Sequence, residues 1–269
     1  MERETLAIAG HPDPSPERLH RFHRDLRRIR VELETLRHLL PRGDRDRAAE
    51  LLRRLGRVAR LVGEVRDFDV GLALLAHPRL RRASGSSSED FVRTRGRLQE
   101  EARTGRALLG AFLRAELDRG LVMELERVLA VARPRMSERR LERAAATERA
   151  RSGGRAMRAI RRARRRPSPR RMHRLRSALR HARHLHELSS PGTGRDLRPF
   201  SSRLERLQQA LGRLHDLDVL IDGLEGLGPA VWESEWARFE RRRRRQLRAE
   251  ITEELDRKEI RERVARLAE

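Results

Sequence analysis

The chain of 269 residues contains no cysteine and no tyrosine, and aromatic residues make up only 3% of it. The absence of cysteine excludes disulfides, iron–sulfur clusters and cysteine-ligated zinc, and it fits a reducing compartment. The scarcity of aromatic rings leaves little surface on which the bases of a single-stranded nucleic acid could stack. The sequence also lacks an apolar run of about 18 residues, the minimum for a membrane span, and a signal-peptide pattern at its N-terminus. We therefore expect a cytoplasmic protein that makes no use of a membrane.

The charge of the chain is strongly positive, with a formal net charge of +23. Lys258 is the single lysine, so arginine carries nearly all of the positive charge. A guanidinium group stays charged at any accessible pH and can engage two phosphate oxygens at once. Because apolar residues make up 37% of the chain and charged residues 39%, we expect a narrow core built from the apolar stripes of helices. This composition suits an all-α protein with a polyanionic partner.

A basic motif in two parts occurs twice in the chain. The first part is HRFHRDLRRIR at 20–30 and HRLRSALRHAR at 173–183. The second part is a Gly-x-x-[Arg/His]-Asp-x-Asp-Val signature, which follows at 63–70 and at 212–219. The duplication predicts two similar halves.

Helical spacing brings the basic residues of each first part onto one side of a helix. Positions 0, +3, +7 and +10 fall within about a quarter of the circumference of an α-helix. Several like charges side by side need water or an anionic partner. The first stripe lies beside the apolar face of its helix, so we expect it to border a groove between helices. We define the first basic stripe as His20, His23, Arg27 and Arg30, and the second as His173, Arg176, Arg180 and Arg183.

Apolar spacing and helix-stop residues predict the order of helices. The first helix begins at Pro16, with Ser15 as its cap, and continues to Leu40; a second begins at Asp44 and ends near Gly63. Three prolines make residues 1–15 a poor helix, which we expect to be flexible. Further helices are predicted at 91–118, 121–133, 135–165, 172–188, 200–211, 229–250 and 252–267. Loops are predicted at 84–90 and 189–194, and a linker at Pro167 and Pro169.

These motifs resemble the CHAD domain, a family named for its histidine-bearing α-helical repeats. The family pattern on the first helix is close to His-x-x-Arg-Val-x-x-Arg-Arg-x-Arg, which the chain follows with His23 and His181 at two positions where arginine is usual. Its second pattern is close to Leu-Gly-x-x-Arg-Asp-x-Asp-Val, in which His215 replaces the arginine of the second copy. Since histidine is mostly neutral near pH 7, these replacements predict an anion affinity that depends on pH. The resemblance covers about residues 16–267.

The resemblance implies a fold and a function. It implies one domain of two four-helix-bundle repeats, at about 16–165 and 168–267, related by a pseudo-two-fold axis. The basic stripes would meet around a central groove or pore that binds inorganic polyphosphate, or other phosphate or sulfate anions, without turnover and without a cofactor. Because only residues 1–15 precede the first repeat, we expect a stand-alone binder. The expected polyphosphate-binding residues are His20, His23, Arg27, Arg28, Arg30, Arg66, His173, Arg176, Arg180, His181 and Arg183.

The paired aspartates of the signatures have two interpretations. Asp67 with Asp69, and Asp216 with Asp218, would either hold a divalent metal for phosphate chemistry or cap the helix that follows. No further ligand of fixed spacing accompanies them, and acids at the start of a helix satisfy free backbone amides. We favour the caps, and we predict no metal site and no catalytic residue.

Two other functions stay open. The arginine runs at 161–166 and 241–245 are an electrostatic footprint for nucleic acid, but without a recognition module they predict only non-specific binding. The second hypothesis is a scaffold on polyphosphate granules, in which the basic face binds the granule and an apolar helix face binds another protein or a storage polymer.

Overall fold

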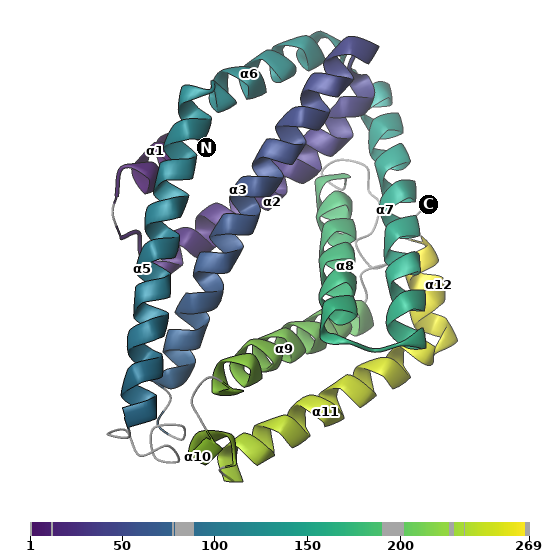
Figure 1. The fold of residues 1–269 in the computed structure, drawn as a ribbon. Helices are drawn as coiled ribbons and strands as arrows, with labels where there is room; N and C mark the ends of the chain where they lie inside the picture. Colours follow the sequence, from purple (N-terminus) through teal and green to yellow (C-terminus); the bar gives the residue numbers. More distant parts are fainter. Residues whose placement is uncertain are drawn as a thin grey trace. The chain divides into compact units, whose positions relative to one another are not determined.

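The computed structural model describes residues 2–11, 13–76, 78, 89–189, 202–225, 229–233 and 235–266. Throughout these ranges the secondary structure is helical and contains no strand, which confirms the predicted all-α class (Figure 1). The chain separates into two compact units, Met1–Ala144 and Ala145–Glu269. The division falls inside α7 (Glu138–Arg165), ahead of the linker predicted at Pro167 and Pro169. The reason is that Ala156, Ile160 and Ala163 of α7 are buried in the core of the second unit.

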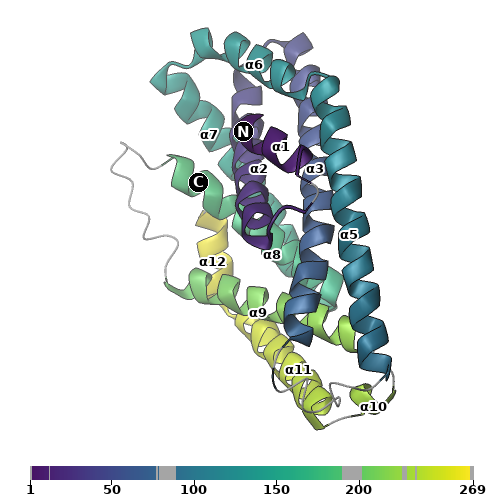
Figure 2. The same ribbon diagram turned by 90° about the vertical axis from the view of Figure 1, so that its left-hand side faces the viewer.

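The first unit is built around one long helix. It contains α1 (Glu2–Ala9), α2 (Pro16–Leu36), α3 (Arg42–Leu75), α5 (Glu89–Asp118) and α6 (Leu121–Ala132). Helix α3 packs against α2, α5 and α6, and Figure 2 shows α2, α3 and α5 side by side. Gly120 joins α5 to α6 with a φ of 70°, a left-handed conformation that glycine adopts without strain. The buried core of this unit includes Phe22, Leu26, Leu55, Val58, Val62, Leu109, Leu113 and Val128.

Helix α2 begins where the sequence predicts. Pro16 is its first residue, and the Ser15 Oγ accepts a hydrogen bond from the Arg18 backbone N–H at 3.3 Å. The α-helix ends at Leu36, and a 3₁₀ turn continues over Arg37–Leu39. The apolar residues predicted at three- and four-residue steps lie in the core, among them Leu19, Phe22, Leu26 and Leu33.

The prediction of a poor helix before residue 16 is wrong for Glu2–Ala9, which form α1. Thr5, Ile8 and Ala9 are buried, and the helix packs against α5. The Arg114 Nη1 donates a hydrogen bond of 2.5 Å to the Ala9 carbonyl oxygen. That carbonyl belongs to the last turn of α1, where helical partners are missing, so the arginine supplies a cap from another helix.

The second helices of both halves are longer than predicted. Helix α3 continues for 34 residues through Gly63, and α9 (Ser202–Glu225) continues through Gly212. A glycine inside a helix costs about 1 kcal/mol, but Val62 and Val65 on either side of Gly63 are fully buried and favour continuation of the helix. Both signatures therefore lie inside helices. The prediction that their aspartates cap a helix start is wrong.

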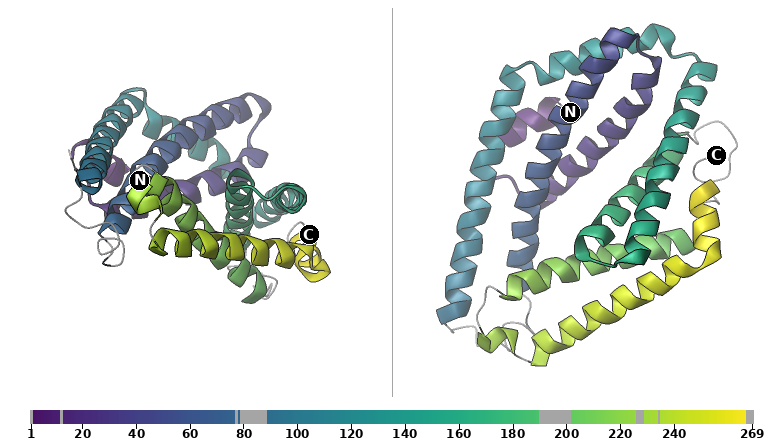
Figure 3. Two further views of the ribbon diagram at one scale, coloured as in Figure 1. Left: turned by 60° about the horizontal axis from the view of Figure 1, so that its bottom comes forward. Right: turned by 45° about the vertical axis from the view of Figure 1, so that its right-hand side comes forward.

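The second unit is built around α9. After α7 it contains α8 (Pro169–Ser189), α9, α10 (Pro229–Trp232), α11 (Glu235–Asp256) and α12 (Lys258–Arg266). Helix α9 packs against α8 and α11, and Figure 3 shows α9 and α11 running alongside each other. The buried core includes Ile160, Met172, Leu175, Leu179, Leu207, Leu211, Leu214, Ile251 and Leu255.

The described residues do not test the predicted loops, the pseudo-two-fold axis or the central pore. Residues 84–88 and 190–194 of the two predicted loops lie outside the described residues. The pseudo-two-fold axis and the central pore concern the placement of the two units, and they stay predictions. Among the described helices, none combines the length and the apolar character that crossing a membrane requires.

Candidate polyanion-binding site

The first basic stripe lies along the junction of α2 and α3. The Arg66 Nη1 lies 3.2 Å from the His23 Nδ1, within hydrogen-bond distance. A Cβ atom added to Gly63 would lie 3.6 Å from the Cε1 of His23, and one added to Gly56 would lie 3.7 Å from the Nη2 of Arg30. Both are ordinary contact distances, so the two glycines place the backbone of α3 directly beside the basic groups of α2. The stripe therefore lies where α2 meets α3, and the groove expected beside it stays a prediction.

The second basic stripe lies along the junction of α8 and α9. The ring centroids of His173 and His215 are 5.1 Å apart. The Arg183 Nη1 donates a hydrogen bond of 3.4 Å to the Gln208 Oε1, and its Nη2 lies 3.7 Å from the Glu205 Oε1. The Gln208 Nε2 in turn donates to the Leu179 carbonyl oxygen at 3.1 Å. These contacts orient the last guanidinium of the stripe from the neighbouring helix.

The arginines of both stripes are half-buried rather than fully solvated. Arg27, Arg30, Arg176 and Arg180 all have intermediate exposure. The Arg27 Nε donates to the His23 carbonyl oxygen at 3.3 Å, so its own helix supports it. The Arg30 Nε is buried and has no hydrogen-bond partner among the described residues. Partial burial restricts the motion of these side chains, while part of each residue stays exposed to solvent.

Partial loss of water makes His173 harder to protonate. Desolvation lowers the pKa of the His173 imidazole below its usual value, and the positive charges of Arg176 and Arg180 lower it further. His215 contacts the same ring from α9. His173 is therefore mainly neutral at pH 7 in the free protein.

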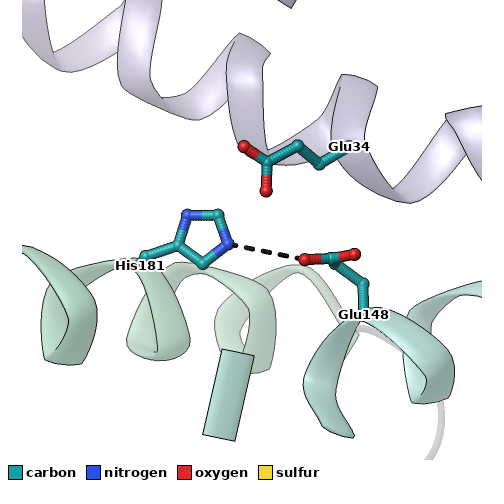
Figure 4. Close-up of side chains that lie close together, drawn as sticks. All are labelled: Glu34, Glu148 and His181. Carbon is teal, nitrogen blue, oxygen red and sulfur yellow. Dashed lines mark ion pairs between the residues drawn. The ribbon is translucent and has the colours of Figure 1, made fainter. Parts of the chain in front are cut away.

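Two residues that family position adds to the expected site lie apart from the stripes. Arg28 is exposed, and its Nε donates to the Glu32 Oε1 on the same helix at 3.1 Å. His181 faces α7, where its Nε2 lies 3.0 Å from the Arg155 Nη2. The same nitrogen lies 4.0 Å from the Glu148 Oε1 (Figure 4). His181 thus takes part in the packing of α7 against α8, and its role in binding stays a prediction.

Each signature contributes one aspartate to an ion pair with the next long helix. The Asp69 Oδ1 lies 2.5 Å from the Arg106 Nη2 of α5. The Asp218 Oδ1 lies 3.1 Å from the Arg248 Nη2 and 3.7 Å from the Arg244 Nη1, both on α11. Burial raises the pKa of both carboxyl groups, and the neighbouring guanidiniums oppose that shift. These pairs join the second helix of each unit to the third long helix.

The geometry of the signatures does not support the metal interpretation. Residues two apart on an α-helix point about 200° away from each other. Asp67 is accordingly exposed, whereas Asp69 forms a largely buried ion pair with Arg106. Asp216 and Asp218 have the same arrangement. The two carboxylates of a signature therefore do not face a common ion.

Glu205 and Gln208 contact the second stripe but are not among the site residues expected from the sequence. A signal was present, because Glu205, Gln208, Gly212 and His215 follow one another at steps of three, four and three residues, like the stripes themselves. The prediction of a helix end near residue 212 hid this pattern. No spacing pattern in the sequence points to the arginines that pair with Asp69 and Asp218, because these arginines come from helices distant in the sequence.

Comparison with known proteins agrees with the motifs. The family model described as the CHAD domain matches residues 2–225, a region that contains both stripes and both signatures. No curated protein and no solved structure gives a significant match. CHAD domains are associated in general with polyphosphate binding. Because the family model matches well over half of the chain, the chain belongs to the CHAD domain family.

Proposed function

We propose that the chain binds inorganic polyphosphate without turning it over, and that the two basic stripes are the contact surface. The observation that carries this proposal is the position of the stripe arginines, which are half-buried along a helix junction in each unit. Arginines that only kept a surface charged could be fully solvated and would not need a neighbouring helix to position them. Membership of the CHAD domain family, with its general association with polyphosphate, agrees with the proposal.

The chemistry of the ligand suits a row of guanidiniums. A polyphosphate chain bears about one negative charge per phosphate and offers no base edges or rings to recognise. Each charge-assisted hydrogen bond to phosphate contributes about 1.5–3 kcal/mol before losses to ordering and screening. We propose binding without catalysis because Asp69 and Asp218 are each held in an ion pair, and because the two aspartates within each signature point to different sides of their helix.

The proposal extends to location. A protein that binds long polyphosphate chains would accumulate on polyphosphate granules, so we propose granule association. Microscopy of the fluorescently tagged protein tests granule association. A variant with the stripe arginines replaced by alanine should lose its granule signal and become dispersed. A variant signal that stays on the granules would contradict the proposal.

The direct test is calorimetric titration with long-chain polyphosphate at physiological salt, with duplex DNA at equal phosphate concentration as the competitor. We expect tight binding that survives the DNA. By analogy with nucleic acids, the affinity should fall by orders of magnitude as salt rises through the physiological range, because binding releases counterions. Binding that DNA abolishes would contradict a polyphosphate receptor.

Non-specific nucleic-acid binding is the second candidate, and one observation favours it. Arg161, Arg162, Arg165 and Arg166 are exposed at the end of α7 and the turn that follows it. The second arginine run is less available, since the Arg241 guanidinium lies 4.0 Å from the Trp232 ring and Arg244 pairs with Asp218. The competition experiment separates the two candidates.

The lowered pKa of His173 predicts that polyphosphate binds more tightly as the pH falls. A polyanion would offset the charges of Arg176 and Arg180 that oppose protonation, so the pKa of His173 would be higher in the complex than in the free protein. Protonation and binding then favour each other. The affinity should therefore rise as the pH falls from above the pKa of His173 in the complex, and it should level off below the pKa of His173 in the free protein.

The control for this prediction is His173→Gln, which keeps a polar side chain and removes the titration. We expect a smaller rise in affinity for this variant over the same pH range, measured by calorimetry. Identical pH profiles for the variant and the unsubstituted protein would contradict the assignment to His173.

A further inference from the structure

The residues that oppose the two basic stripes differ in charge. In each unit a row on the second helix, with steps of three, four and three residues, faces the stripe. We call these the facing rows. In the first unit the residues that contact the stripe are Gly56, Gly63 and Arg66. In the second unit they are Glu205, Gln208 and His215. The complete first row is Gly56, Ala59, Gly63 and Arg66, and the complete second row is Glu205, Gln208, Gly212 and His215.

In the first unit the last arginine of the stripe has no acidic neighbour in the facing row. The Arg30 guanidinium lies over Gly56, which has no side chain. Its Nε has no hydrogen-bond partner among the described residues, and none of their carboxylates forms an ion pair with it. Arg66 adds a further positive charge at the other end of the row, next to His23. A bound phosphate would meet no competing carboxylate on this row.

In the second unit the corresponding arginine is engaged. Glu205 occupies the position that Gly56 has in the first unit, and its Oε1 lies 3.7 Å from the Arg183 Nη2. Gln208 accepts a hydrogen bond from the other terminal nitrogen of the same guanidinium. Both partners of the ion pair are partly exposed, at 39% for Arg183 and 45% for Glu205. An anion could therefore reach Arg183, but it would have to displace Glu205 and would be repelled by it.

We propose that the two stripes are unequal polyphosphate sites, with the first stripe the stronger, and that Glu205 weakens the second stripe by competing with the ligand for Arg183. The inference rests on the proposed function. Glu205 is thus an affinity-determining residue that acts through Arg183. Unequal stripes would make short polyphosphate chains occupy the first unit before the second.

Reciprocal charge changes in the two facing rows test the inference. Glu205→Gln keeps the size of the side chain and removes its charge, so it should tighten binding of short-chain polyphosphate by about two- to fivefold, the range expected for an exposed ion pair. Gly56→Glu should weaken binding by a similar factor. The matched control is Gly56→Ala, whose Cβ would lie 3.7 Å from the Arg30 Nη2, an ordinary contact distance; it adds no charge and should change the affinity much less than Gly56→Glu.

The salt dependence of binding supplies an independent measure. If Glu205→Gln releases Arg183 for one more phosphate contact, the slope of log affinity against log salt should become steeper by about 0.7–0.9. A further comparison uses paired substitutions: Arg27→Ala with Arg30→Ala should weaken binding more than Arg180→Ala with Arg183→Ala. Each of these differences is measured by calorimetry on the full chain.

The outcomes separate the inference from the proposed function. If the unsubstituted protein does not bind polyphosphate, both fail. If it binds, but Glu205→Gln leaves the affinity and the salt slope unchanged, only the inference fails. Weaker binding by Glu205→Gln would also overturn it, because Glu205 would then orient Arg183 for the ligand. Tighter binding with a steeper slope, together with a larger loss of affinity by Gly56→Glu than by Gly56→Ala, would establish unequal stripes.

Discussion

The quadruple alanine variant of the stripe arginines should bind long-chain polyphosphate on the order of a hundredfold more weakly than the unsubstituted protein. Each guanidinium is expected to supply charge-assisted hydrogen bonds, and the loss is smaller than their sum because the contacts are not independent. Helical content should stay the same, since these side chains lie beside the apolar core and not in it. The variant replaces Arg27, Arg30, Arg180 and Arg183, and calorimetry at physiological salt measures the change.

The matched control removes the same number of positive charges elsewhere. Arg241 and Arg244 are unsuitable, because one contacts Trp232 and the other pairs with Asp218. The control set should bind polyphosphate nearly as tightly as the unsubstituted protein, after allowance for general electrostatics. An equal loss from both sets would mean that the net charge alone attracts the ligand. The control set is Arg161, Arg162, Arg242 and Arg245, all of which are exposed.

The second large effect concerns the stability of the first unit. Glu116 of α5 is fully buried, and its Oε2 accepts a hydrogen bond of 2.6 Å from the Arg54 Nε of α3. The Arg54 Nη2 also donates to the carbonyl oxygens of Glu116 and Arg119 at the end of α5. Arg54→Ala leaves a buried carboxylate without this partner, so the free energy of unfolding should fall by about 3–5 kcal/mol. Urea unfolding followed by circular dichroism measures the loss.

Two further variants make this stability prediction specific. Arg53→Ala removes the neighbouring residue on α3, whose partner Glu50 is exposed, and should leave the stability nearly unchanged. Replacing both members of the buried pair, as Arg54→Met with Glu116→Leu, should recover much of the loss, because no unpaired charge remains. A small effect of Arg54→Ala, or no recovery in the double variant, would show that the pair does not hold α3 to α5.

Local sequence patterns predicted most helices, including the start of α2 at Pro16 with Ser15 as its cap. They failed where packing outweighed local preference. Gly63 and Gly212 marked expected helix ends, but burial of their apolar neighbours carries both helices past them. Prolines led to the expectation of a poor helix before residue 16, although α1 precedes them and packs on α5.

The sequence by itself determined the helical class, the duplication and the two basic stripes, because a stripe depends only on the residue spacing within one helix. Tertiary structure alone decided what each stripe faces. Glycines lie beside His23 and Arg30, whereas Glu205 and Gln208 contact Arg183. It also decided that Asp69 and Asp218 pair with arginines of distant helices instead of capping their own. Such partners come from elements far apart in the chain, and only the packing of those elements brings their charges together.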